Sequence, residues 1–271
     1  MKTHDAWRLV VVFAGILLST SGYAAHHGDA KDDEICQGYG PQTPRDIDSL
    51  GGTNKVKFQL AGSSSELNLC NIHFHKNAEH KAKEFSIFAG KGKDGGYQCG
   101  ISKSLTKAEL KTPKEEICKG LQPGDTIEVH WVHSSCAVQP GPGLGSCLSE
   151  ACANPDLRVE TQVFTLVNDS SALDFNDLDY AGSQVNGYHQ AKSIPSNTGA
   201  PVVFAGSTTG PSYTEQACSA LQVTWSVRPQ CAKLDINTIG KWCESNDFNE
   251  DHAHGVRELV TNKALLSPIA N

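Results

Sequence analysis

Long apolar segments are scarce in this sequence of 271 residues. The run Leu9–Leu18 has ten residues, whereas a membrane-spanning helix needs about 20, and no later segment is long and apolar enough to span. A weakly positive start precedes this run, and small residues such as Ser21, Ala24 and Ala25 follow it. We therefore predict that residues 1–25 are a secretory signal peptide cut after Ala24 or Ala25, with an uncleaved anchor as the alternative.

Clusters of positive charge are also scarce. The formal net charge is −7, and the lysines that gather within residues 76–93 are diluted by Asp, Glu or Gly. Proteins that bind nucleic acid carry a basic patch or stripe. The charge pattern therefore argues against nucleic acid as a partner and indicates that these lysines form a solvated surface.

Close C-x-x-C pairs are absent, which argues against cysteine-ligated metal. The sequence nevertheless has ten cysteines, all beyond residue 25, and an even number in an exported chain predicts up to five disulfides. Sequence-local pairs such as Cys99–Cys118 and Cys231–Cys243 are plausible, and residues 136–154 are expected to form a disulfide-pinned loop. We expect a periplasmic or secreted protein.

Short apolar or alternating runs recur between Gly, Pro and Asn turn signals, which predicts a mainly β domain over residues 26–271. The expected strands are Lys55–Leu60, Leu67–His75, Phe85–Ala89, Thr126–His133, Leu157–Val167, Pro201–Ala205 and Leu221–Val227. Helical signals are weak: a turn or two within residues 104–110, and a short helix over residues 257–266 that stops before Pro268. The absence of repeats and of a long linker favours one domain.

Five of the eleven histidines lie between positions 73 and 133, in or near two of these strands. Side chains alternate across a strand, so His73 and His75 share one face, as do Glu128 and His130. If the two strands are neighbours, three imidazoles converge. Three nitrogen ligands with a fourth position left open are typical of a catalytic zinc site, although imidazole also suits Cu, Fe and Ni. His133 has the opposite parity and is expected behind the sheet.

The carboxylate of Glu128 is expected to accept the free ring N–H of His130 and to fix its tautomer. The alternative for Glu128 is a strand carboxylate that faces solvent.

Five blocks in order, spanning roughly residues 36–227, resemble carbonic anhydrases of the alpha class. They are Gly40–Ile47 (GPQTPRDI), His73–His75 (HFH), Ala78–His80 (AEH), Glu128–His133 (EVHWVH), and Gly206–Pro211 (GSTTGP) with Glu215 and Val223–Trp225 (VTW). However, 54 residues separate His75 from His130, and the cysteine content is higher than in that class. The segment N-I-H-F-H and the cysteine-rich insertions are more similar to the delta class.

The resemblance implies an alpha-carbonic-anhydrase-like α+β fold, mainly β, with a large twisted, mostly antiparallel sheet and short peripheral helices. It implies zinc on His73, His75 and His130, and hydration of carbon dioxide to bicarbonate and a proton by zinc-bound hydroxide. Thr208 would accept a hydrogen bond from that hydroxide and donate its own proton to Glu79.

The resemblance assigns further roles. Thr209 would line the bicarbonate site, and three apolar residues would form the carbon dioxide slot: Val132, Val159 and Trp225. Because a leucine is missing before the paired threonines, either of them could contact the hydroxide. Glu84 is the fallback for Glu79, and His80 is expected to be structural. The proton-shuttle residue is unknown, with His189, His252 and His254 as unranked candidates.

Two alternatives remain open. A cupin would use His73, His75 and Glu79 as ligands for Fe or Mn, but the glycines of its motif are missing and the threonine block stays unexplained. An inactive periplasmic domain that buffers metal or binds carbohydrate would keep the scaffold, but would have no need of Thr208 and Glu79. Inactive relatives usually lose a ligand histidine, and none is missing here.

Overall fold

The computed structural model describes residues 36, 38–114, 117–208 and 218–270. The predicted signal peptide, Thr209 and Glu215 lie outside the described residues. The elements are β1 (Asn68–Lys76), β2 (Phe85–Gly90), β3 (Gly96–Cys99), β4 (Thr126–Ser134), β5 (Leu157–Val167), β6 (Gln184–Val185), β7 (Tyr188–His189), β8 (Val202–Ser207), β9 (Gln222–Val227), β10 (Ala232–Asp235) and α1 (Ile236–Glu244).

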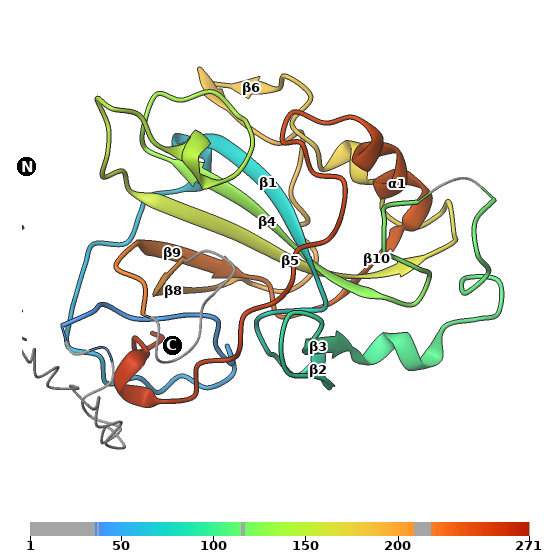
Figure 1. Ribbon diagram of the computed structural model, residues 1–271, viewed down its shortest axis with the longest axis horizontal. Helices are drawn as coiled ribbons and strands as arrows, with labels where there is room; N and C mark the ends of the chain where they lie inside the picture. The colour runs from blue at the N-terminus through green and yellow to red at the C-terminus, as the bar shows by residue number, and fades with distance from the viewer. Residues whose placement is uncertain (1–35, 37, 115–116, 209–217, 271) are drawn as a thin grey trace, which may run out of the picture.

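Six strands form the central sheet, in the order β1-β4-β5-β9-β8, with β10 also paired to β5. The pairs β1–β4, β4–β5 and β8–β9 are antiparallel, whereas β9 and β10 run parallel to β5. Figure 1 shows the twist of this sheet, with short hairpins and α1 around it. The expectation of a mainly antiparallel sheet with short peripheral helices is confirmed.

The strand β5 organises the sheet because it is paired along both of its edges. Residues 157–165 pair with β4, while residues 158–161 pair with β9 and residues 164–167 pair with β10. Nearly all of its residues are consequently buried, including the polar side chains of Glu160, Gln162 and Thr165.

Six of the seven predicted strands are present, but Lys55–Leu60 is not a strand. The helix predicted over residues 257–266 is also wrong, since only a 3-10 turn at Lys263–Leu265 forms there. The described α-helix, α1, was missed because Thr, Ile and Gly give it weak intrinsic propensity. Asp235 caps the N-terminus of α1, and Ile239 and Trp242 on its apolar side are buried in the core.

Two apolar layers cover the sheet. On the back face, Phe74, Val129 and Trp131 pack with Ile239 and Trp242 of α1. On the front face, which also carries His73, His75 and His130, a second cluster contains Val132, Val159, Val163, Phe204 and Trp225. The candidate site therefore lies on one face of a sheet whose other face is filled by a dense core.

All ten cysteines are paired, so the expected number of disulfides is correct: Cys36–Cys218, Cys70–Cys147, Cys99–Cys231, Cys118–Cys243 and Cys136–Cys152. The predicted sequence-local pairs Cys99–Cys118 and Cys231–Cys243 are wrong. The fold instead pairs each of these cysteines with one more than 100 residues away, because β10 and α1 return to the segments that flank β3 and β4. Within the described parts of the chain, no helix is long and apolar enough to cross a membrane.

Candidate metal centre

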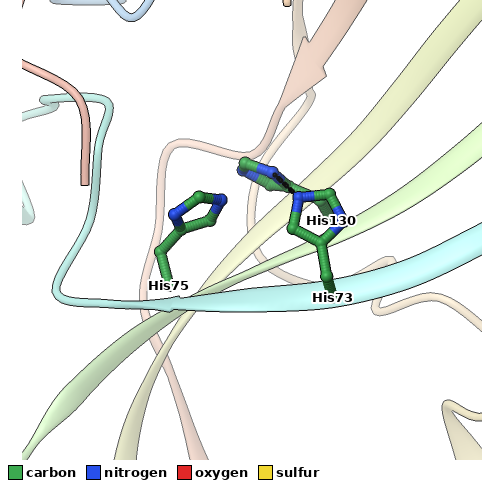
Figure 2. Close-up of side chains that lie close together, drawn as sticks. All are labelled: His73, His75 and His130. Atoms are coloured by element: carbon green, nitrogen blue, oxygen red, sulfur yellow. Dashed lines mark hydrogen bonds between the residues drawn. The ribbon is translucent and has the colours of Figure 1, made fainter. Parts of the chain in front are cut away.

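Three histidines from the two predicted strands converge on the front face of the sheet. In the antiparallel register, His73 on β1 lies opposite His130 on β4, and His75 lies opposite Glu128. Each of the three rings offers one nitrogen, and these nitrogens lie within 4.8 Å of one another. Figure 2 shows the rings turned toward a common point, with His130 Nδ1 3.2 Å from His73 Nε2.

The other nitrogen of each ring is engaged by a different kind of partner. His73 Nδ1 lies 2.7 Å from Asn71 Oδ1, and His75 Nδ1 lies 2.9 Å from the Gly255 carbonyl oxygen. His130 Nε2 lies 2.7 Å from Glu128 Oε1. Because all three partners are acceptors, these nitrogens carry the protons, and the converging nitrogens carry lone pairs.

With these tautomers, a bound cation would stabilise the three histidines. His73 Nε2 and His130 Nδ1 face each other at 3.2 Å, and two lone pairs at that distance repel unless a positive charge lies between or beside them. Burial, followed by the neighbouring rings, holds the pKa of His73 well below its usual range. Burial also lowers the pKa of His75 to about 4. Neutral imidazoles with aligned lone pairs are the form that binds a metal ion.

Glu128 is fully buried and serves two histidines. Its Oε1 accepts from His130 and from His80 Nδ1, at 2.7 and 2.8 Å, and its Oε2 accepts from the backbone N–H of His80. Burial alone would raise the pKa of Glu128, but His80 and His130 hold it well below its usual range. His80, Glu128 and His130 are also close enough to hold an ion. We favour the other trio because its three residues border an open pocket, whereas His80 and Glu128 do not.

A pocket of about 750 Å³ opens above the three histidines. Val132, Val159 and Trp225, the predicted slot residues, all line it. They form one row across the sheet, since Val132 pairs with Val159 and Val159 pairs with Trp225. Leu157 and Val223 extend the apolar wall. The pocket therefore combines three nitrogen ligands at its base with one apolar side.

Glu79 and Thr208 border the same pocket, from the segment after β1 and the end of β8. Within the described residues the two share no hydrogen bond. Glu79 is instead bound by Arg257, whose Nη2 donates to Oε2 at 2.8 Å and whose backbone N–H donates to Oε1 at 2.9 Å. Although burial raises the pKa of Glu79, the Arg257 guanidinium lowers it to about 2. The fallback residue Glu84 lies elsewhere, exposed, and accepts from the Cys231 backbone.

Sequence reasoning named His254 as a shuttle candidate but missed Gly255 and Arg257, although the segment 254–257 contacts the site at several points. Gly255 accepts from His75, Arg257 binds Glu79, and the His254 backbone pairs with Phe74 and Lys76 of β1. A Cβ on Gly255 would lie 2.6 Å from Lys93 Cβ, so glycine allows this close approach. No local motif marks this segment, because its role depends on contacts about 180 residues distant.

The three shuttle candidates lie at different distances from the cluster. The ring of His254 lines the pocket 5.6 Å from that of His73 and 5.8 Å from that of His75, and its side chain is 44% exposed. His252 stacks against His254. His189 is buried beside the Tyr180 hydroxyl, on β7. The structure therefore brings one of the three candidates to the pocket. His133 lies on the back face, fully buried, beside the Trp131 carbonyl.

A trio of converging imidazoles that borders an apolar-sided pocket defines a candidate metalloenzyme site. A model of the delta carbonic anhydrase family matches residues 64–238, a stretch that includes all three histidines. The chain belongs to the delta carbonic anhydrase family and is therefore a carbonic anhydrase.

Two solved structures show weak similarity. A hyperthermostable carbonic anhydrase from an active hydrothermal vent chimney is 17% identical, with coverage of 90% of this chain and 93% of that chain and a TM-score of 0.36. An alpha-carbonic anhydrase from Thermovibrio ammonificans, in complex with sulfanilamide, is 14% identical, with coverage of 79% and 82% and a TM-score of 0.27. The family assignment rests on the family model alone. No curated protein matches the chain.

Proposed function

We propose that this carbonic anhydrase uses zinc, held by His73, His75 and His130, to interconvert carbon dioxide with bicarbonate and a proton. The observation that carries the proposal is the pair of ring nitrogens that face each other at 3.2 Å while their opposite nitrogens are engaged by acceptors. This arrangement suits a cation bound by three neutral imidazoles, with a further position open to the pocket. Bound zinc would acidify its water to the familiar carbonic anhydrase pKa of about 7 and so supply a nucleophile at neutral pH.

The pocket residues would divide the remaining work. Carbon dioxide is apolar, so Val132, Val159 and Trp225 would hold it beside the histidines without a hydrogen bond. Thr208 would accept a hydrogen bond from the nucleophile and donate a hydrogen bond from its own hydroxyl to the Glu79 carboxylate, which would fix the direction of the attacking lone pair. Thr209 is proposed to line the bicarbonate site.

Arg257 supports the role assigned to Glu79. The Arg257 guanidinium binds the Glu79 carboxylate from one side and keeps it ionised. An ionised carboxylate can only accept hydrogen bonds, so its partner must be a donor such as the Thr208 hydroxyl. This ion pair also argues against the cupin alternative, because that reading needs Glu79 as a metal ligand. Neither of the two trios that could hold an ion includes Glu79.

Export to the periplasm or the cell exterior is part of the proposal. Five disulfides require an oxidising compartment to form and persist. The predicted signal peptide at residues 1–25 would supply the route. N-terminal sequencing of the exported protein should begin at Ala25 or His26.

Metal analysis combined with stopped-flow carbon dioxide hydration tests the central proposal. We expect one zinc per chain, hydration activity that chelators remove and zinc restores, and loss of both properties in His130→Ala. Zinc binding without hydration would contradict the proposed reaction. Iron or manganese in place of zinc would favour the cupin, and zinc retention by His130→Ala would contradict the ligand set.

A further inference from the structure

Asn71 lies at the junction between the histidine cluster and the loop formed by residues 136–152 (the 136–152 loop). Its Oδ1 accepts from His73 Nδ1 at 2.7 Å, and its Nδ2 donates to the Gly141 carbonyl at 3.0 Å. The residue is 1% exposed, so water cannot readily replace either partner. Because one end of an amide accepts and the other donates, these two contacts together specify a single orientation of the Asn71 side chain.

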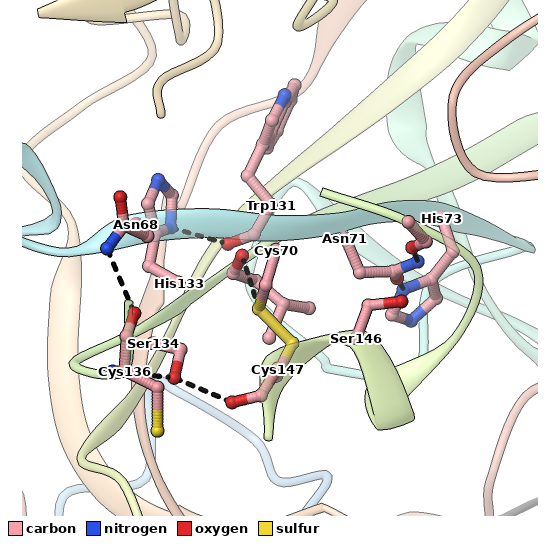
Figure 3. The surroundings of a disulfide bond; sticks show 12 residues. Asn68, Cys70, Asn71, His73, Trp131, His133, Ser134, Cys136, Ser146 and Cys147 are labelled. Carbon is pink, nitrogen blue, oxygen red and sulfur yellow. Dashed lines mark hydrogen bonds between the residues drawn. A yellow bond between two sulfur atoms is a disulfide. The ribbon is translucent and has the colours of Figure 1, made fainter. Parts of the chain in front are cut away.

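An irregularity in β1 makes this junction possible. Leu69 pairs with His133 and Asn71 pairs with Val132, which leaves Cys70 as an extra residue in the strand. Strict alternation would point Cys70 to the back of the sheet, whereas a bulge of this kind re-aims a side chain. Cys70 accordingly packs in the front cluster with Val132 and Val159. Figure 3 shows it bonded there to Cys147 of the loop, next to Asn71.

The 136–152 loop is fixed on the front face at several points. Cys70–Cys147 attaches it to β1, and Cys136–Cys152 closes its base. The Gly141 N–H donates to the Cys70 carbonyl at 3.0 Å, and the hydroxyl of Ser134, at the end of β4, donates to the Cys147 carbonyl at 2.7 Å. The position of the Gly141 carbonyl, the acceptor for Asn71, is thereby tied to the same strand that carries His73.

We propose that the 136–152 loop is a positioning element for the metal centre, acting through Asn71. The Cys70–Cys147 disulfide holds Gly141 in place, Gly141 orients the Asn71 amide, and Asn71 fixes the ring and tautomer of His73. Loss of an outer hydrogen-bond partner of a metal-bound histidine costs about 10- to 100-fold in metal affinity. The inference rests on the proposed function only in taking zinc as the metal, and it does not depend on the hydration reaction.

The first test measures zinc affinity of the metal-free protein by competition with a chromophoric chelator. We expect Asn71→Ala to raise Kd for zinc by about 10- to 100-fold. Removal of the disulfide by Cys70→Ala with Cys147→Ala should raise it by a smaller factor. The combination of all three changes should bind no more weakly than Asn71→Ala alone, because the disulfide acts through that residue. Independent, multiplying effects would overturn the proposal.

The matched control removes Cys99–Cys231, which also joins distant segments but does not border the pocket above the three histidines. Both disulfide variants should lose thermal stability, yet only the loss of Cys70–Cys147 should weaken zinc binding. Equal zinc affinity in the two disulfide variants would overturn the proposal.

A second test needs no cysteine variant, and so it stands even if removal of a disulfide prevents folding. If the loop raises zinc affinity, zinc must stabilise the loop by the same free energy. Zinc should therefore slow the reduction of Cys70–Cys147 by a phosphine more than it slows that of Cys99–Cys231, as followed by mass spectrometry. Asn71→Ala should remove this difference. Equal protection of the two disulfides in the wild-type protein would overturn the proposal.

These outcomes are distinct from a failure of the proposed function. A wild-type protein that binds zinc but does not hydrate carbon dioxide contradicts that function, and the zinc comparisons still decide the role of the loop. Normal hydration with unaltered zinc affinity in the Cys70/Cys147 variant overturns the loop proposal alone. A wild-type protein that binds no zinc overturns both.

Discussion

On the back of the central sheet, β1 and β4 contribute Phe74, Val129 and Trp131 to an apolar layer that α1 covers, whereas the alternating residues on the front are His73, His75 and His130. The same two strands thus build a core and a candidate metal centre on opposite faces. The back layer is held mainly by shape and volume, although the ring N–H of Trp131 donates to the Leu178 carbonyl at 2.9 Å and that of Trp242 donates to Asp179 Oδ1 at 2.8 Å.

The front face is specified in a different way. Each of its three histidines is fixed by a partner of its own: an amide for His73, a backbone carbonyl for His75 and a carboxylate for His130. Those partners come from different parts of the chain, including the segment 254–257. The comparison teaches that the back face depends mainly on burial, whereas the front face depends on directed contacts, so changes on the two faces should affect different measurements.

The largest effect on the metal centre is expected from removal of a ligand. His130→Ala should weaken zinc binding by more than the roughly 100-fold that loss of an outer partner can cost, and should abolish hydration. The change leaves a small cavity beside Trp225, so thermal stability should fall only moderately. Chelator competition and stopped-flow hydration measure both effects. Retained hydration activity would show that the His130 ring is not required as a zinc ligand.

Changes in the proposed relay should slow turnover while zinc remains bound. Thr208→Val removes the hydroxyl without a large change in volume, and we expect kcat to fall by about 100-fold, as for other directed hydrogen bonds to a reacting group. Glu79→Gln should have a similar effect, and the double variant should be no slower than either one. Additive losses in the double variant would contradict a shared relay. Zinc content, measured in parallel, should remain one per chain.

Replacement of the partner of His130 should have a smaller effect than replacement of the ligand itself. Glu128→Gln keeps the size of the side chain but removes the charge that two histidines share. We expect Kd for zinc to rise about 10- to 100-fold. Glu84→Gln, at an exposed carboxylate away from the pocket, is the matched control and should bind zinc as the wild type does. Equal affinities would mean that Glu128 serves only the packing of His80.

A cavity on the back face should lower the stability of the protein but leave its zinc affinity unchanged. Ile239→Ala removes buried volume between α1 and the sheet, which should lower the free energy of unfolding by about 2–5 kcal/mol. Zinc affinity should nevertheless stay close to that of the wild type, since no partner of the three histidines lies on α1. Denaturant unfolding of the metal-free protein gives the first quantity, and chelator competition gives the second. A large loss of zinc affinity would contradict the proposal that the back face does not affect zinc binding.

The smallest effect is expected at Glu109, which pairs with Lys233 of β10 and does not border the metal-site pocket. Its hydrogen bonds with Lys233 and Thr106 lower the pKa of the carboxyl from 4.5 to about 2. Because the folded-state pKa is depressed, this contact stabilises the protein above the unfolded-state pKa and is lost as pH falls toward 2. Glu109→Gln should thus be less stable than the wild type at pH 7, and the difference should shrink below pH 4.5. Unfolding curves at pH 7, 4 and 2.5 test this, and a difference independent of pH would contradict it.

Much of the fold could be predicted because strand signals are local. The run Leu157–Val167 corresponds to β5 without a change of boundary, and the ends of the two histidine strands lie within one residue of their predicted positions. The segment Lys55–Leu60 has similar alternation but finds no partner strand, and so it stays irregular. The residues of α1 favour a helix only once Asp235 caps them and Trp242 is buried.

Some residues of the candidate site could likewise be predicted from the sequence, and others could not. The parity of His73 and His75, and of Glu128 and His130, follows from alternation in strands, and the family resemblance singled out Thr208, Glu79 and the slot residues. Asn71 could also have been found, since it shares the front face two residues before His73. Arg257 and Gly255 could not, because nothing near them in the sequence indicates that they return to β1.

By itself, the sequence determined which side chains share a face, how many disulfides form, and which family the chain resembles, since each of these depends on spacing or composition. Only the tertiary structure decided the disulfide partners, the bulge that turns Cys70 toward the 136–152 loop, and the acceptor assigned to each histidine. The physical reason is that hydrogen bonds and disulfides need specific atoms within a few ångströms. That proximity between residues up to 182 positions apart arises only when the whole chain has folded.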